Sequence, residues 1–147
     1  MLPMDRDYKL LSAIVVEQLH QWADDALGGA EGDHARKTWH SILGSVASEA
    51  HLRGIAIDEH GLSEANRVTE QATYLAFLRA VAANLVSGAL SDAERLRGRV
   101  DPAAIGVLSA WRRAIACIQD QAEVVGIGLE KLGLDKIDPD NDIMGAI

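Results

Sequence analysis

Three side chains near the amino terminus are spaced like metal ligands on one face of a helix. Glu17 and His20 form a Glu-x-x-His pair, and Asp24 follows one turn later. Residues three, four and seven apart share a helix face, so the three groups would point the same way. Helical bundles that hold metals with bridging carboxylates use such pairs on facing helices. The stripe predicts either a metal site or a solvated polar face, since no second pair falls within a helix-forming segment.

Two further residues, His60 and Arg79, could contact a ligand. His60 follows two acids in a predicted loop over residues 54–62, and a histidine flanked by carboxylates can act as a general base. Loops on a rigid scaffold often carry function. Arg79 interrupts the most apolar stretch of the chain. It predicts either a buried ion pair or an anchor for an anion or carboxylate in a pocket between helices.

The remaining reactive residues do not form a catalytic pattern. The single cysteine, Cys117, has no histidine nearby in the sequence to activate it. Asp138, Asp140 and Asp142 match the first ligand positions of a calcium loop, but Ile143 replaces the required glycine. The sequence contains no glycine-rich nucleotide loop and no zinc-ligand spacing. We therefore expect no cofactor, and a binding protein rather than an enzyme.

The composition is that of an acidic, aliphatic chain. Its 147 residues include 22 acids and 14 lysines and arginines, for a net charge of -8 at pH 7. Nucleic acids and anionic membranes both attract positive charge, so the composition disfavours them as partners. One cysteine permits no intramolecular disulfide, and the first residues lack the apolar core of a secretory signal. These features predict a cytoplasmic protein.

The elements that position these residues are predicted to be helices throughout. Apolar residues recur at three- and four-residue steps, and glycines, serines and aspartates mark the helix ends. The predicted helices cover residues 4–27, 34–53, 63–88, 91–98 and 102–132. The third is apolar nearly all round, which is typical of a central helix. The sequence thus predicts an all-α fold: a single helical bundle of four to five helices over residues 1–133, then an irregular tail over residues 134–147.

The long last helix carries the most regular pattern in the sequence. Its apolar residues alternate three- and four-residue steps, as in the a/d seam of a heptad repeat. The seam comprises Leu108, Trp111, Ile115, Ile118, Ala122, Val125, Leu129 and Leu132. A helix over residues 102–132 would be about 46 Å long, which spans or exceeds a compact domain of this size. Gly126 and Gly128 each cost about 1 kcal/mol in helix propensity, so the sequence also allows a bend or break there. The seam either packs inside an antiparallel bundle of one chain or meets a second copy in a dimer or higher oligomer.

These patterns favour function by protein–protein interaction. The hypothesis is a small soluble helical protein that acts as an oligomerising adaptor, regulator or inhibitor, with itself and another protein as partners. An apolar helix face, here the heptad seam, would form the contact. The alternative is an α-helical enzyme, or a domain that binds a small ligand or a metal between its helices. In that case Arg79 would anchor the ligand and a histidine would act as acid–base group or metal ligand.

Overall fold

The computed structural model describes residues 7–28 and 34–146, which are mostly helical. The α-helices in these ranges are α1 (Tyr8–Gly28), α2 (Arg36–Leu52), α3 (Gln71–Arg95) and α4 (Pro102–Val125). The shorter elements are β1 (Ile57–Asp58), β2 (Gly61–Leu62), the 3-10 turns η1 (Leu129–Lys131) and η3 (Met144–Ala146), and the π-helical turn η2 (Pro139–Ile143). The prediction of an all-α helical bundle is confirmed.

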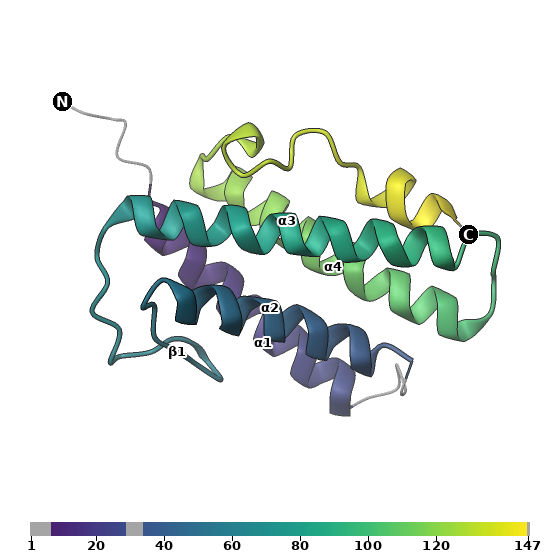
Figure 1. Ribbon diagram of the computed structural model, residues 1–147, viewed down its shortest axis with the longest axis horizontal. Coiled ribbons are helices and arrows are strands. Elements are labelled where there is room, and N and C mark those ends of the chain that lie inside the picture. Colours follow the sequence, from purple (N-terminus) through teal and green to yellow (C-terminus); the bar gives the residue numbers. More distant parts are fainter. Residues whose placement is uncertain (1–6, 29–33, 147) are drawn as a thin grey trace.

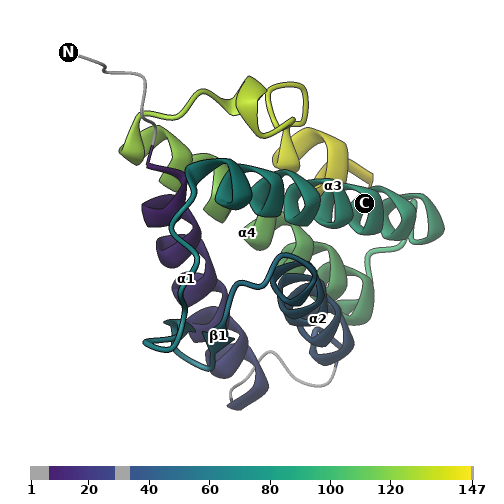
Figure 2. The same ribbon diagram turned by 60° about the vertical axis from the view of Figure 1, so that its left-hand side comes forward.

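The four α-helices pack into one bundle, with α3 at its surface. α1 contacts α2, α3 and α4, and α3 also packs against α4. α2 lies along one flank of α3, and the C-terminal segment that contains η2 and η3 lies along the other (Figures 1 and 2). The two-stranded antiparallel hairpin of β1 and β2 packs on α1. The flanks of α3 are therefore where grooves between elements can form.

The heptad seam lies inside the core of the single chain. Leu108, Ile115 and Ile118 are fully buried, and Trp111 is only 7% exposed. They belong to one cluster with the buried residues of α1, α2 and α3. Of the two arrangements left open by the sequence, this is packing within one chain. In this fold Leu108, Ile115 and Ile118 are not available as a surface for a partner.

α4 ends at Val125 rather than at residue 132. Gly126 follows with a φ of 86°, the left-handed conformation that glycine adopts readily and that ends helices. The rest of the predicted seam therefore leaves the helix. Leu129 is half-buried in η1, and Leu132 is buried just after that turn. The expectation of one helical face through Val125, Leu129 and Leu132 is wrong, and the seam ends with the helix.

α3 is one continuous helix where the sequence predicted two. It begins at Gln71 instead of residue 63, and it runs to Arg95 without a break at Gly88. The side chain of Tyr74 helps to keep the preceding stretch non-helical. Its hydroxyl donates a hydrogen bond to the carbonyl oxygen of Val68 at 2.6 Å. This hydrogen bond competes with the helical conformation that the sequence predicted from residue 63 onward.

The amino-terminal ends of α1 and α2 fall beside residues that the structure does not describe. α1 is predicted from residue 4, and its described part begins at Tyr8. Asp7 caps it, because its Oδ1 accepts a hydrogen bond from the backbone N–H of Leu10 at 2.9 Å. Asp33, the predicted cap of the second helix, lies outside the described residues. α2 itself begins at Arg36.

The C-terminal segment is more ordered than predicted. Leu134 and Ile143 are buried in the bundle. Gln119 of α4 donates hydrogen bonds from its side-chain amide to the carbonyl oxygens of Leu134 and Ile137, at 3.1 and 3.0 Å. The turns η2 and η3 follow. The expectation of an irregular tail is thus wrong for this part of the chain, because buried apolar residues and Gln119 hold it against α4.

Candidate functional site

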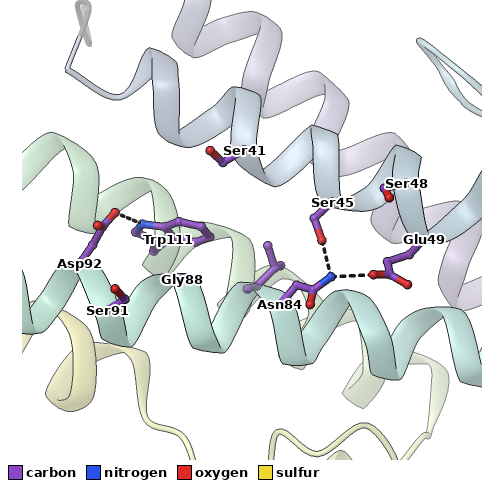
Figure 3. A pocket seen from close by; sticks show the side chains of 10 residues that line it. Ser41, Ser45, Ser48, Glu49, Asn84, Gly88, Ser91, Asp92 and Trp111 are labelled. Carbon is purple, nitrogen blue, oxygen red and sulfur yellow. Dashed lines mark hydrogen bonds between the residues drawn. The ribbon is translucent and has the colours of Figure 1, made fainter.

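A groove of about 570 Å³ runs between α2 and α3 (Figure 3). Its walls are small and polar side chains: Ser41, Ser45, Ser48 and Glu49 from α2, and Asn84, Gly88, Ser91 and Asp92 from α3. Leu85 of α3 and Trp111 of α4 complete the lining. We call this hollow the serine-lined groove. A volume of this size is within the range of sites that bind small molecules or peptide segments.

One end of the groove is fixed by the indole of Trp111. Its Nε1–H donates to Asp92 Oδ2 at 2.8 Å, and Arg95 donates to the other oxygen of Asp92 at 3.1 Å. The ring lies against Gly88, where a Cβ would come within 2.5 Å of Cη2 of the indole. Glycine is therefore required here for close packing, and the tryptophan from the heptad seam contributes to the groove.

The other end of the groove is fixed by Asn84. Its Nδ2 donates to Ser45 Oγ at 3.0 Å and to Glu49 Oε2 at 2.8 Å (Figure 3). Arg53 donates to Glu49 Oε1 at 2.7 Å. The hydrogen bonds from Arg53 and then from Asn84 lower the pKa of the Glu49 carboxyl group, since both favour its ionised form. This network links α2 to α3 at the groove.

We expect the Glu49 network to make stability depend on pH. Because the pKa of Glu49 is lower in the folded chain, its stabilising effect is present above the ordinary value of 4.5 and is lost as the pH falls below that value. The stability difference between wild type and Glu49→Gln should therefore shrink on acidification. Urea unfolding at neutral and acidic pH measures this. Asn84→Ala should give part of the effect, and a pH-independent difference would contradict the assignment.

The lining of the groove is rich in hydroxyl groups. Among the described residues, no histidine or cysteine lines it, so its hydroxyl groups have no base of that kind to activate them. The hydroxyl groups of Ser41, Ser48 and Ser91 have no hydrogen-bond partner in this part of the chain and can bond to a partner molecule. Cys117 lies elsewhere and is buried, and burial raises its thiol pKa to about 12. That thiol stays protonated at neutral pH.

The predicted metal stripe on α1 does not come together as a metal site. His20 Nδ1 lies 2.8 Å from the carbonyl oxygen of Val16, a contact within its own helix. Glu17 and Asp24 are exposed. No group of three or more histidine, cysteine, aspartate or glutamate side chains within residues 7–28 and 34–146 is placed to hold a metal ion. The stripe matches the alternative interpretation, a solvated polar face.

His60 lies on the hairpin beside the same helix. Together with Glu59 it borders a notch of about 270 Å³, whose other side includes Glu17 and Asp24. The fold therefore brings together residues that the sequence suggested for two different sites. The His60 side chain is 86% exposed, and its Nε2 lies 3.5 Å from the Glu59 carboxylate.

Arg79 is exposed, so the expectation of a buried ion pair is wrong. It makes no hydrogen bond or ion pair with the residues that the structure describes. Asn84, the other polar residue of this apolar helix, is also exposed and joins the serine-lined groove. Arg79 instead borders a second groove, on the opposite flank of α3 and beside η1. The role of Arg79 as an anchor for a ligand between elements stays a prediction.

The residues of the serine-lined groove were not predicted as a site, although part of the signal is in the sequence. Ser41, Ser45 and Ser48 recur at helical steps on one side of α2. Small polar residues at this spacing indicate a helix face without large side chains. The sequence cannot show that Asn84 and Asp92 lie opposite, because that depends on how α2 and α3 pack. A serine stripe together with an isolated asparagine is the signal that could have suggested the groove.

The described residues form an α-helical bundle with an open groove between α2 and α3. Comparison of the chain with family models, curated proteins and solved structures found no match.

Proposed function

We propose that the protein acts by association with a second copy of itself, through the outward side of α2 and α3 around the serine-lined groove. We call this surface the α2–α3 face. It comprises Ser41, Gly44 and Ser48 of α2, and Ala80, Asn84 and Ser91 of α3. The heptad seam, which the sequence suggested as the contact surface, lies inside the core. The α2–α3 face is therefore the candidate contact surface.

The exposed side of α3 is the observation that carries this proposal. By length and composition, α3 is the one helix in the described ranges that is apolar enough to cross a membrane. Core helices of soluble proteins pass the same test but are mostly buried, whereas only 39% of the most apolar stretch of α3 is buried. Arg79 and Asn84 interrupt this stretch, Asn84 on the side of the serine-lined groove and Arg79 on the opposite flank. Polar groups of this kind are costly in lipid, which favours a protein partner over a membrane.

α2 supports the same surface through an exposed glycine. Gly44 lies inside the helix, and a Cβ at this position would meet no atom within 4 Å. Glycine in a helix interior costs about 1 kcal/mol relative to alanine, and no contact within the single chain requires it here. Ser41 and Ser48 lie one turn to either side. These small side chains allow a second helix to approach α2 closely.

The charge distribution supports a second copy as the partner. Two chains with a net charge of -8 repel each other unless the surfaces that meet lack free acids. Both acids that line the serine-lined groove are paired, Glu49 with Arg53 and Asp92 with Arg95. The α2–α3 face itself contains no acid. A self-complementary contact about a two-fold axis is also the commonest form of oligomer.

Light scattering on a size-exclusion column, over a wide range of protein concentration, tests the proposal. We expect wild type to approach twice the chain mass of 15.8 kDa as concentration rises. Gly44→Leu should weaken dimerisation about tenfold or more, because its side chain occupies the closest approach of the two helices. The variant should remain folded, since that position is open within the single chain.

Val124→Leu is the matched control for added bulk. Val124 is 78% exposed on α4, away from the α2–α3 face, so this variant should dimerise like wild type. Ser48→Glu, which places a charge on the face, should weaken the dimer as Gly44→Leu does. A wild-type mass equal to one chain at every concentration would rule out self-association.

A further inference from the structure

An apolar side chain stands next to the serine-lined groove. Ser41, Ser45 and Ser48, which line the groove, follow one another at four- and three-residue steps along α2. Leu52 continues these steps and therefore lies on the same side of the helix. Its exposed fraction is 72%, and within Arg36–Leu52 it is the only large apolar residue that is exposed. The side of α2 that faces the groove thus ends in an apolar knob.

The knob lies beyond the end of the groove that Asn84 fixes. Asn84 donates to Glu49 at that end, and Ser41 lies at the other end (Figure 3). Leu52 is the last residue of α2 and follows Glu49 by three residues. Ser45 is the middle of the α2 wall of the groove, and it precedes Leu52 by seven residues, about 10 Å along the helix axis. A hollow and a knob therefore lie side by side on one surface.

The inner part of the groove suits an apolar side chain. Leu85 is fully buried, Trp111 is 7% exposed, and Gly88 between them in the lining is half-buried. The serines Ser41 and Ser91 are exposed, so their hydroxyl groups lie at the rim. Contacts between proteins commonly have this arrangement, an apolar centre inside a polar rim. The hollow, of about 570 Å³, has room for a leucine side chain.

We propose that, in the dimer, Leu52 of each copy inserts into the serine-lined groove of the other copy. This inference rests on the proposed function and specifies its contact. In a two-fold contact, a residue that meets a second residue on the partner is met in turn by that residue's own counterpart. Leu52 and Ser45 must then lie at equal distances from the axis. The axis passes beside Ser48, where the two copies of α2 cross antiparallel.

The knob is tested by measuring dimer affinity with light scattering. Leu52→Ser should weaken dimerisation about tenfold or more, because each dimer buries two leucine side chains. Leu52→Met, which retains a side chain of similar volume, should dimerise within a few-fold of wild type. Val124→Ser is the matched control, since Val124 is 78% exposed near the end of α4. Wild-type affinity in Leu52→Ser would overturn the proposal.

The position of the axis is tested by disulfide cross-linking. We expect Ser48→Cys, oxidised with copper phenanthroline, to give a covalent dimer of twice the chain mass of 15.8 kDa, because the two thiols meet at the axis. Ser41→Cys is the matched control, since its two copies would lie about 20 Å apart along the helix direction. Cys117 is buried and is present in both variants. Cross-linking of Ser41→Cys in preference to Ser48→Cys would overturn the proposal.

The same variants separate this inference from the proposed function. A wild-type protein that stays monomeric at every concentration would rule out both. Suppose instead that wild type dimerises and that Gly44→Leu weakens the dimer. If Leu52→Ser then has wild-type affinity and Ser48→Cys does not cross-link, the α2–α3 face stands as the contact surface and the insertion of Leu52 is overturned.

Discussion

Gly88→Ala should destabilise the fold, although alanine is the better helix former. A Cβ at residue 88 would lie 2.5 Å from Cη2 and 2.9 Å from Cζ2 of the Trp111 indole. The indole cannot retreat easily, because its Nε1–H donates to Asp92 and the ring is only 7% exposed. Overpacking of this kind costs about 1–3 kcal/mol. The gain in helix propensity, about 1 kcal/mol, offsets only part of it.

Gly44→Ala is the control for this substitution, since both glycines lie inside α-helices. At residue 44 the added Cβ meets no atom within 4 Å, so only the helix propensity changes. The free energy of unfolding should rise by about 0.5–1 kcal/mol. Urea unfolding of both variants at low protein concentration measures the two effects. The same sign in both variants would contradict the packing of Trp111 against Gly88.

Near-UV circular dichroism gives an independent readout for the same pair of variants. Gly88→Ala should change the tryptophan signal, because the indole of Trp111 must shift to accommodate the new methyl group. Gly44→Ala should leave that signal unchanged. A stability loss in Gly88→Ala without a spectroscopic change would point to a cause other than displacement of the indole.

The local periodicity of the sequence predicted which residues form the core but not how far the helices extend. Leu108, Ile115 and Ile118 follow from their spacing alone, since the spacing fixes one face of a helix. The end of α4 depends on the left-handed backbone conformation of Gly126. The low helix propensity of glycine allows a break at that residue, whereas the heptad pattern alone continues past it. The late start of α3 depends on the hydrogen bond from Tyr74 to Val68. The spacing of apolar residues carries no signal of that side-chain bond.

The grooves could not be derived from the sequence, because each depends on how α3 packs against a neighbouring element. Ser45 and Asn84 meet across the serine-lined groove, although they are far apart in the sequence. Arg79 was singled out correctly as unusual in an apolar helix. Its exposure and its place beside the C-terminal segment follow only from packing. The sequence shows the chemical type of each residue, whereas its neighbours in space are known only from the fold.

Ile118→Ala should produce the largest loss of stability among these variants. Ile118 is fully buried in the centre of α4. Removal of its branched side chain leaves a cavity that a close-packed core fills only in part, and such changes cost about 2–5 kcal/mol. The matched control is Val124→Ala on the same helix. Val124 is 78% exposed, and we expect its stability change to stay within about 0.5 kcal/mol.

The concentration dependence of the Ile118→Ala result distinguishes the two arrangements of the heptad seam. If the seam packs within one chain, the loss of stability is the same at every protein concentration. At temperatures where the variant is folded, a dimer formed through α2 and α3 then keeps its affinity. If the seam joined two chains, the variant would instead release folded monomers, and the difference in unfolding midpoint between wild type and variant would grow with protein concentration. Replacing both Ile115 and Ile118 with aspartate should unfold the chain outright, since neither charge would have a partner in the core. A double variant that is folded but has a lower solution mass than wild type would show that the seam lies at the interface between chains.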